Sequence, residues 1–550
     1  MPTVAFHTLG CKVNHYETEA VWELFKNEGY EKVDFKEVAD VYIINTCTVT
    51  NTGDKKSRQV IRRAIRRNPE AVMCVMGCYA QTKPKEIMDI DGVDIVIGTH
   101  GRDQIPALVQ KYREERQPIS QIQNVFKVDG FETLNVTQFS DRTRATLKIQ
   151  DGCNNFCTYC IIPWARGTVR SQKPEVVIEQ VKQLVEHGHC EVVLTGIHTA
   201  AYGEDLEDYS FGKLLQDLID IEGLKRIRIS SIEASEVTDD VIAAMKKSDK
   251  IVNHLHMPIQ AGSDTILKGM KRPYTLAEFE QKVTELRELF DNLAITTDVI
   301  VGFPGETEEL FNETLETIKR IGFSELHVFP YSVRNGTPAA RMEDNVSEAD
   351  KKDRLNRLNE AINRGFRAGN KRFEGQIVDV LVEGTSKNDD TMLAGYTRHN
   401  KLVNFKGDAS KIGQIVNVKI TEAKTWHLAG EMVNDDTTTN LPSFEKLKEK
   451  LATDPIMERY RQLTQKVHQN EKLLALYDEY IKKQKELIKF EHYGKLNAKL
   501  QKEAEMKALE DELYDNPLFN EYIQTQIELN ELFSTMTHII QYKVNKHLSE

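Results

Sequence analysis

Short apolar runs alternate with longer amphipathic stretches over the first hundred residues of the chain. The runs at 41–44 and 71–76 predict buried parallel strands, because they are apolar on both faces. Residues 54–67 and the segment after Gln81 predict the crossover helices between such strands. This order of elements indicates an α/β domain with a parallel sheet over residues 1–115.

The same alternation of short apolar runs and amphipathic stretches recurs, with more repeats, over residues 140–345. Strand-like runs, each followed by a charged stretch of helix length, lie at 145–149, 191–195, 226–230, 253–257, 295–301 and 325–331. This repetition predicts a partial (βα)6 barrel. Functional groups are then expected at the carboxyl ends of its strands.

A polar helix predicted at 347–372 is followed by short β-patterned runs, which predict a small β-barrel over residues 370–432. After the polar segment 434–440 the composition changes. Residues 443–550 are rich in Glu, Lys, Leu and Gln, contain almost no glycine, and repeat apolar residues with helical spacing. They predict an all-α module, separate from the α/β part of the chain.

The chain contains no stretch near the roughly 20 consecutive apolar residues of a membrane-spanning helix. Its first residues lead directly into a strand pattern, without the charged and apolar regions of a signal peptide. We therefore expect a cytoplasmic protein that has no membrane partner.

A formal net charge of −12 argues mildly against a nucleic-acid partner, although a local basic face can still bind RNA. One predicted helix carries a basic cluster made of Lys55, Lys56, Arg58, Arg62, Arg63, Arg66 and Arg67. Arg58, Arg62 and Arg66 recur every four residues and share one helix face. That face either neutralises RNA phosphates or is an ordinary solvated surface, and the sequence does not decide between them.

The cysteines are more informative than the charge. The chain has eight, and all of them lie before residue 191. A disulfide framework needs an oxidising compartment, which nothing in this sequence suggests. Clustered cysteines in a cytoplasmic protein indicate metal ligands or catalytic thiols instead.

Cys153, Cys157 and Cys160 have the spacing C-x3-C-x2-C and directly follow a predicted strand. An iron–sulfur cubane takes thiolate ligands, so three thiolates leave one iron without a protein ligand. An open position is typical of a catalytic metal site. The alternatives are a zinc site that lacks its fourth ligand or a chance spacing. We expect this triplet to hold a 4Fe-4S cluster.

A second, dispersed set consists of Cys11, Cys47 and Cys78, each just past a predicted strand. In an open parallel sheet these strand ends converge on one crevice, so three thiolates there could hold another cluster with an open iron. The alternative is three separate buried thiols. Cys74 and Cys190 lie in predicted strands and are interpreted as small core residues.

With its C-x3-C-x2-C loop the chain resembles the radical-SAM superfamily, whose signature is this loop after the first barrel strand. The resemblance implies that S-adenosylmethionine chelates the open iron through its amino and carboxylate groups. Neighbouring segments imply further contacts with this cofactor, through Gly196, Ser231, Glu233 and Gly302. Taken alone, the glycines indicate only turn chemistry.

The segments around the dispersed cysteines resemble the methylthiotransferase family, which combines a three-cysteine domain, a radical-SAM barrel and a TRAM barrel. The resemblance covers residues 1–432 and implies two 4Fe-4S clusters, an electron donor protein and a tRNA anticodon stem-loop as partners. Residues 8–14 and 45–50 resemble the branch that converts N6-threonylcarbamoyladenosine next to the anticodon into its 2-methylthio derivative.

This implied chemistry has a physical rationale. Carbon 2 of an adenine is an unactivated C–H position with no acid–base route to sulfur insertion. The resemblance implies that a 5′-deoxyadenosyl radical formed at the Cys153 triplet attacks it, while the Cys11 set supplies the methylthio group. The alternatives are the same reaction on isopentenyladenosine or on a protein aspartate, and a non-catalytic RNA-binding scaffold.

Two C-terminal segments imply binding partners. Residues 373–431 resemble a TRAM domain, a small barrel that binds RNA, in which Arg398, Lys401 and Phe405 are candidate contacts. Residues 445–550 resemble the YlbF/YmcA family of small helical interaction proteins. This segment has no cysteine, so cluster binding there is not expected. Its apolar stripe forms either a bundle core or a groove for protein partners.

Overall fold

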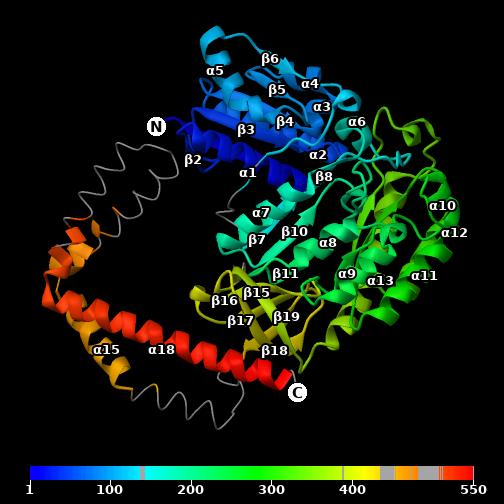
Figure 1. Ribbon diagram of the computed structural model, residues 1–550. Coiled ribbons are helices and arrows are strands. Elements are labelled where there is room, and N and C mark those ends of the chain that lie inside the picture. Colours follow the sequence, from blue (N-terminus) through cyan, green and yellow to red (C-terminus); the bar gives the residue numbers. More distant parts are fainter. Residues whose placement is uncertain are drawn as a thin grey trace. The chain divides into compact units, whose positions relative to one another are not determined.

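The structure is a computed structural model of the 550-residue chain (Figure 1). It describes residues 1–134, 136, 143–386, 389–433, 451, 454–470, 472–477, 479–480, 483, 507, 509–510 and 512–548. The chain divides into two compact units, residues 1–434 and residues 435–550, and each is described by itself.

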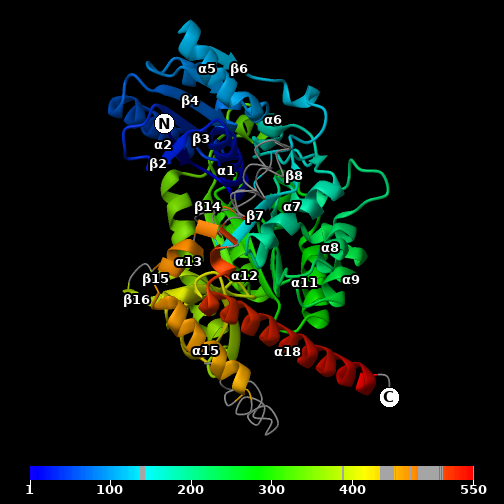
Figure 2. The ribbon, with the colours of Figure 1, turned by 60° about the vertical axis from the view of Figure 1, so that its left-hand side comes forward.

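The first unit begins with a parallel sheet of strand order β2-β1-β3-β4-β5-β6. Its strands are β1 (Thr3–Thr8), β2 (Glu31–Val33), β3 (Val41–Thr46), β4 (Val72–Gly77), β5 (Ile95–Ile97) and β6 (Ile119–Gln121). Its helices are α1 (Lys12–Asn27), α2 (Asn51–Arg67), α3 (Cys78–Thr82), α4 (Pro84–Met88) and α5 (Ile105–Glu115). Helices α2, α3 and α4 pack on one face and α1 and α5 on the other, which leaves β3 and β4 entirely buried (Figure 2).

The predicted barrel strands are all present. They are β7 (Arg144–Lys148), β10 (Glu191–Thr195), β11 (Arg226–Ile229), β12 (His254–His256), β13 (Ala294–Val301) and β14 (Glu325–Pro330). The first three and the last three form parallel sheets, and a bridge between Ile227 and Ile251 joins them. No ladder among the described residues pairs β7 with β14, so the barrel is open between these two strands.

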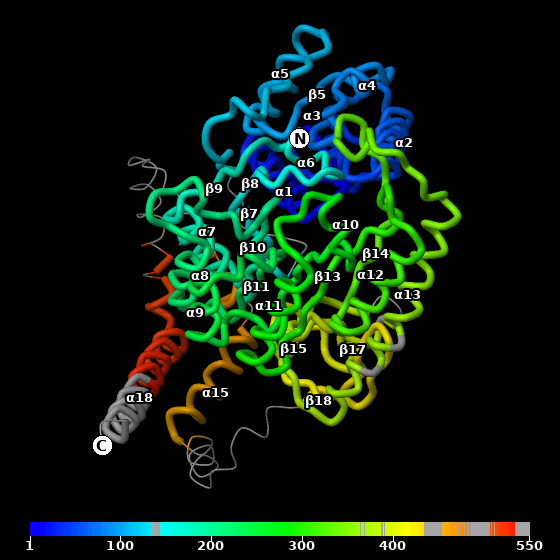
Figure 3. The backbone as a smooth tube through the Cα atoms, turned by 90° about the vertical axis from the view of Figure 1, so that its right-hand side faces the viewer, coloured from blue at the N-terminus to red at the C-terminus, as the bar shows by residue number. Residues whose placement is uncertain are grey.

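Helices cover the outside of this barrel, as Figure 3 shows. They are α7 (Pro174–Glu186), α8 (Phe211–Ile219), α9 (Asp239–Lys247), α10 (Asp264–Gly269), α11 (Leu276–Leu289), α12 (Glu308–Ile321) and α13 (Glu348–Lys371). Between β7 and α7 the chain forms a small substructure of β8 (Gln150–Asp151), α6 (Ile162–Arg166) and β9 (Arg170–Ser171). This substructure carries the cysteine triplet.

The five-stranded closed barrel predicted after α13 is also present. Its strands are β15 (Ile377–Ser386), β16 (Asp389–Thr397), β17 (Leu402–Lys406), β18 (Ile415–Ala423) and β19 (Leu428–Met432). Phe405 is fully buried in its core, so the interpretation of Phe405 as an RNA contact was wrong. Arg398 donates to the carbonyl of Ile251, and Lys401 donates to the carbonyl of Ser324 at 2.7 Å. These two cations therefore attach the small barrel to the large one.

The described part of the second unit is helical, as predicted, and includes α15 (Pro455–His468) and α18 (Pro517–Leu548). Asp454 caps α15 by accepting from the amide of Ile456 at 2.9 Å. The apolar stripe of this second unit forms a core of Leu463, Val467, Leu473, Leu513, Phe519 and Tyr522. No described helix of the chain is long and apolar enough to cross a membrane.

The burial of Phe405 yields a stability prediction. Phe405→Ala should destabilise the small barrel by about 3–5 kcal/mol, because it removes a ring from a closed core and leaves a cavity. Hydrogen exchange of the β16 and β17 amides in the full chain measures this local loss. Ile377→Ala, on an exposed position of β15, is the control and should change protection by less than about 0.5 kcal/mol. Equal effects of the two substitutions would contradict the core assignment.

Candidate active site

The loop with Cys153, Cys157 and Cys160 follows β8, and its backbone is closely constrained. Gly152 has φ +75°, and a Cβ there would lie 1.8 Å from the carbonyl oxygen of Thr168, so only glycine fits. The amide of Cys153 donates to Gly167 O at 3.0 Å, and that of Cys160 donates to Cys157 O at 3.0 Å. The loop is thus folded around its three thiols.

Basic side chains approach this triplet. The Arg272 guanidinium donates to Cys157 Sγ at 3.3 Å and forms an ion pair with Glu233. Burial lowers the pKa of His198, but its ion pair with Glu236 and the nearby Cys153 outweigh this effect and raise the pKa to about 11. The positive charges of Arg272 and His198 can therefore compensate negative charge on the thiolates.

Cys11, Cys47 and Cys78 lie at the carboxyl edge of the N-terminal sheet, past β1, β3 and β4. Cys11 is the N-cap of α1, and Cys78 is the first residue of α3. Gly10 has φ +113°, and a Cβ on it would lie 3.2 Å from Cys47 Sγ. Burial raises the pKa of Cys78 to about 12, and charge on Cys11 and Cys47 adds to the shift, so the three thiols are electrostatic neighbours.

The other two cysteines lie apart from these sets. Cys74 is fully buried within β4, where burial raises the pKa of its thiol. Cys190 precedes β10, with its Sγ 3.6 Å from the carbonyl oxygen of Gly413. Their interpretation as packing residues agrees with these positions.

Each cysteine set fits a cluster better than a single ion. Among the described residues, no three His, Cys, Asp or Glu side chains converge closely enough to hold one metal ion. A cubane does not require such convergence, because each thiolate binds a different iron. Three soft sulfur donors without a nearby fourth ligand also suit iron–sulfur binding better than closed zinc coordination.

A buried network of charges joins the two sets, with Arg166 at its centre. Arg166 is fully buried, and its Nε donates to Cys78 Sγ at 3.2 Å. Its guanidinium also donates to Asn14 Oδ1 at 2.9 Å and to Glu17 Oε2 at 3.1 Å, both on α1. Asp151, two residues before Cys153, accepts from the same group at 3.3 Å. One side chain of the barrel thus touches the surroundings of both cysteine sets.

Further ion pairs compensate the acids of this network. Lys148 lies 2.9 Å from Glu17 and 2.6 Å from Asp151, and Arg102 lies 2.6 Å from Glu17. Burial alone would raise the pKa of Glu17, but Arg102 and Arg166 outweigh it and lower the pKa to about 2. The carboxylates therefore stay ionised, and the N-terminal domain is held to the barrel through buried charge.

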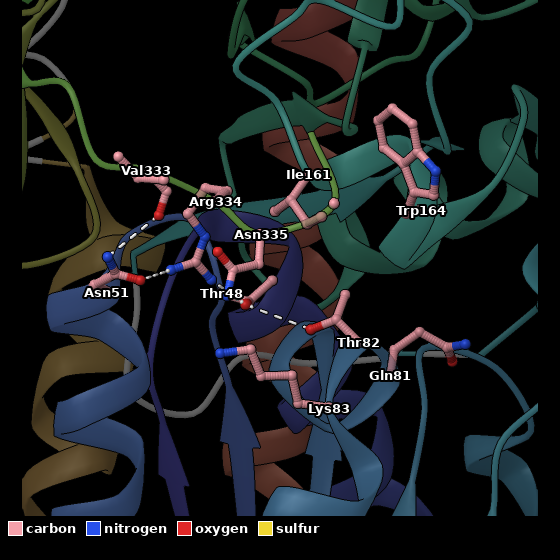
Figure 4. Close-up of a pocket in the computed structure, with 11 residues that line it drawn as sticks. Thr48, Asn51, Gln81, Thr82, Lys83, Ile161, Trp164, Val333, Arg334 and Asn335 are labelled. Atoms are coloured by element: carbon pink, nitrogen blue, oxygen red, sulfur yellow. Dashed lines mark hydrogen bonds between the residues drawn. The ribbon is translucent and has the colours of Figure 1, made fainter. Parts of the chain in front are cut away.

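A second contact between the two domains lies beside a cavity of about 410 Å³ (Figure 4). Arg334, 4% exposed, follows β14 and donates to Asp54 Oδ2 at 3.1 Å, to Thr48 Oγ1 at 2.5 Å and to Asn51 Oδ1 at 2.8 Å. Lys83 and Trp164 line the same cavity. The loop of Cys47 is thereby tied to the end of the last barrel strand.

A cavity of about 660 Å³, the central cavity, opens between Cys11 and the barrel strands. Of the four residues predicted to contact the cofactor, Gly196 and Ser231 line it. Glu233 and Gly302 are not among its lining residues. Gly302 has φ +74°, a conformation typical of a turn glycine, and lies against the side chain of Lys351.

A smaller cavity of about 280 Å³ lies beside Cys160 and is lined mainly by apolar side chains, among them Ile300 and Tyr331. Asp298 and Phe329 line both this cavity and the central one, so the two are adjacent. Two adjacent cavities thus lie near the two cysteine sets, an apolar one beside Cys160 and a larger one beside Cys11.

Sequence reasoning singled out six cysteines as candidate ligands but gave no role to the side chains around them, which include Arg166, Arg334, Arg272 and His198. One feature of the sequence could have indicated the arginines: they lie in otherwise apolar or glycine-containing turns next to predicted strand ends. Their partners are remote in sequence, so the contacts themselves have no local pattern.

Comparisons with known families divide the chain into the same parts. Residues 3–98 match the uncharacterized protein family UPF0004, residues 147–318 the radical SAM superfamily, and residues 371–433 the TRAM domain. Residues 442–545 match the family described as control of competence regulator ComK, YlbF/YmcA.

Curated relatives cover most of the chain. The threonylcarbamoyladenosine tRNA methylthiotransferase MtaB of Bacillus subtilis is 57% identical over 447 residues, which span 80% of this chain and 99% of that protein. A tRNA-2-methylthio-N(6)-dimethylallyladenosine synthase of Clostridium perfringens is 39% identical over 78% of this chain and 96% of that protein.

Solved structures are more distant. The radical S-adenosylmethionine methyltransferase TsrM of Kitasatospora setae has a TM-score of 0.48 and 15% identity, over 62% of this chain and 77% of that one. The sequence relatives therefore carry the family assignment.

The buried network predicts the effect of removing Arg166. Arg166→Met should lower the free energy of unfolding by about 3–5 kcal/mol, because Glu17 and Asp151 lose a buried cationic partner. Urea unfolding of the iron-free chain measures this without a contribution from bound metal.

Arg320→Met is the matched control, since Arg320 is 57% exposed and pairs with Glu280 on the surface. It should change stability by less than about 1 kcal/mol. An Arg166→Met chain as stable as the control would show that the network does not hold the two domains together.

Proposed function

The chain belongs to the radical-SAM methylthiotransferases that modify tRNA, and we propose that its substrate is N6-threonylcarbamoyladenosine next to the anticodon. The observation that carries this proposal is the 57% identity to MtaB over nearly the whole of that protein. The dimethylallyladenosine synthase is only 39% identical over a similar length. Identity at this level favours the threonylcarbamoyl nucleoside over isopentenyladenosine.

The radical-SAM family binds a 4Fe-4S cluster and S-adenosylmethionine, and we propose Cys153, Cys157 and Cys160 as the ligands. Cys11, Cys47 and Cys78 would hold a second cluster. When bound, the clusters supply an electron to S-adenosylmethionine and a sulfur to the substrate, chemistry that no side chain of this chain can replace. The buried Arg166 and Arg272 donate to Cys78 and Cys157 and would stabilise the thiolates.

The protein's own residues position the substrate and shield it. The central cavity is lined by Cys11 and by barrel residues and adjoins the cavity beside Cys160, so it is the proposed position of the adenine. Gly196 and Ser231 would contact S-adenosylmethionine at the strand ends. Glu233 would act indirectly, through its ion pair with Arg272.

The presence of a TRAM domain and the tRNA-modifying relatives suggest tRNA binding. We propose that the phosphates of the anticodon stem-loop contact the exposed basic residues Lys55, Arg62 and Arg66 of α2. An electron donor protein and protein partners of the helical C-terminal unit also belong to this proposal, with the activity in the cytoplasm.

The substrate assignment predicts the products of the reconstituted enzyme. The anaerobic full chain with S-adenosylmethionine and a reductant should release 5′-deoxyadenosine and methylthiolate a stem-loop RNA that carries threonylcarbamoyladenosine. Mass spectrometry of the digested RNA measures the product. Conversion of an isopentenyladenosine stem-loop instead would refute the substrate, and absence of 5′-deoxyadenosine would favour a non-catalytic scaffold.

The two-cluster proposal predicts distinct effects of the two cysteine sets. Replacing Cys11, Cys47 and Cys78 by alanine should lower bound iron from about eight to about four atoms per chain. 5′-Deoxyadenosine should still form, but no methylthio nucleoside. Cys190→Ala is the control and should keep all the iron. About four irons in the unaltered, oxygen-protected protein would contradict a second cluster.

A further inference from the structure

The barrel interior contains another cavity beside the central one. This side cavity, of about 520 Å³, is lined by residues of β7, β10, β11, β12 and β14 and by Glu383, Tyr396 and Asn400 of the small barrel. It shares the lining residues Lys12, His254, Glu325, His327 and Asn400 with the central cavity, so the two are adjacent.

The charges around the side cavity leave one cation without a partner. Arg144 pairs with Glu383, and Arg228 donates to Glu191 at 2.7 Å. Glu325, a further acidic residue of the wall, interacts with Lys401. The ammonium of Lys12 has no hydrogen bond or ion pair with any described residue.

Crowding of positive charge around Lys12 points to an anionic ligand. Lys12 is an exposed residue, and Arg144 and Arg228, which line the same cavity, carry positive charge close to its ammonium. A negative group placed among these three cations would reduce their mutual repulsion.

Two buried polar atoms of the wall also lack partners. His254 is 5% exposed and lines both cavities. Its Nε2 lies 3.0 Å from Thr296 Oγ1, while its Nδ1 has no hydrogen-bond partner among the described residues. The hydroxyl of Thr143, on the same wall, is likewise without one. Buried polar atoms are normally paired, so these two indicate a polar ligand.

We propose that the side cavity binds the threonyl group of the substrate, with Lys12 as the cation that receives its carboxylate and His254 and Thr143 as hydrogen-bonding partners of its polar atoms. This inference rests on the proposed substrate. It assigns Lys12 the role of a specificity residue.

The geometry of adenine supports this placement. Carbon 2 and the N6 substituent flank the same ring nitrogen, N1, so they lie on one edge of the base. An adenine whose carbon 2 faces the central cavity would therefore direct its N6 substituent into an adjoining space. The side cavity adjoins the central cavity at Lys12, the residue after Cys11.

The same walls disfavour an isopentenyl group. That group has no polar atom, so its binding would leave the buried His254 Nδ1 and Thr143 Oγ1 without partners and would give the Lys12 ammonium no opposite charge. A site built to bind polar groups rejects an apolar analogue strongly for this reason.

The experiment compares two stem-loop RNAs on the reconstituted full chain. One carries threonylcarbamoyladenosine, and the other carries its methylamide, in which the carboxylate is neutral. A charge-assisted hydrogen bond of about 1.5–3 kcal/mol corresponds to about 10- to 100-fold in Kd. The unaltered chain should therefore bind the carboxylate RNA at least about tenfold more tightly in fluorescence anisotropy.

Lys12→Met should reduce this ratio to near one, whereas Lys12→Arg should retain most of it. Iron content of both variants checks that the neighbouring Cys11 still binds metal. Lys56→Met, on the exposed face of α2, is the control: loss of a phosphate contact weakens both RNAs equally and leaves the ratio unchanged.

Two results would overturn the inference, and they differ. If the enzyme methylthiolates the threonylcarbamoyl RNA but Lys12→Met keeps the preference for the carboxylate, the assignment of Lys12 is wrong while the proposed function stands. If the enzyme converts only isopentenyladenosine RNA, the proposed function fails and the inference fails with it.

Discussion

The arrangement of the two cysteine sets depends on the buried guanidinium of Arg166. It donates to Cys78 Sγ and reaches Glu17 on α1 and Asp151 beside the other cysteine loop. A charge without access to water is stable only when it is compensated on every side, so these groups fix one another's positions. The N-terminal sheet and the barrel therefore present their cysteine loops to each other in one orientation. The cavity between them follows from that orientation.

The positions of the cysteines were predictable because each lies beside a strong local signal. Strand β4 is apolar on both faces, and Cys78 follows it at once. A parallel sheet gathers the carboxyl ends of its strands along one edge, so Cys11, Cys47 and Cys78 had to meet once the strands were identified. The barrel was predictable because short strand-like runs recur, each followed by a charged stretch of helix length.

The residues that hold the cysteines were not predictable, because their partners are remote in sequence. Arg166 is separated from Glu17 by 149 positions, and only packing of α1 against the barrel buries both. The prediction that Phe405 contacts RNA was wrong for another reason. Membership of an RNA-binding barrel suggested a stacking role, but strand alternation directs this side chain into the core. The side cavity is lined by residues of five barrel strands and of the small barrel, so no single segment of the sequence indicates it.

The small barrel is also attached to the large one through a buried arginine of β11. Arg226, fully buried, donates to the carbonyl of Asp379 at 2.8 Å and to that of Tyr396 at 3.1 Å. Tyr396 and Asn400, both from the small barrel, complete the wall of the side cavity. A loosely attached RNA-binding module would add affinity but could not determine where a base lies. Because it is anchored by buried arginines and contributes walls to a cavity that adjoins Cys11, the small barrel would, under the proposed function, bind the RNA and help to place the reacting base at the same time.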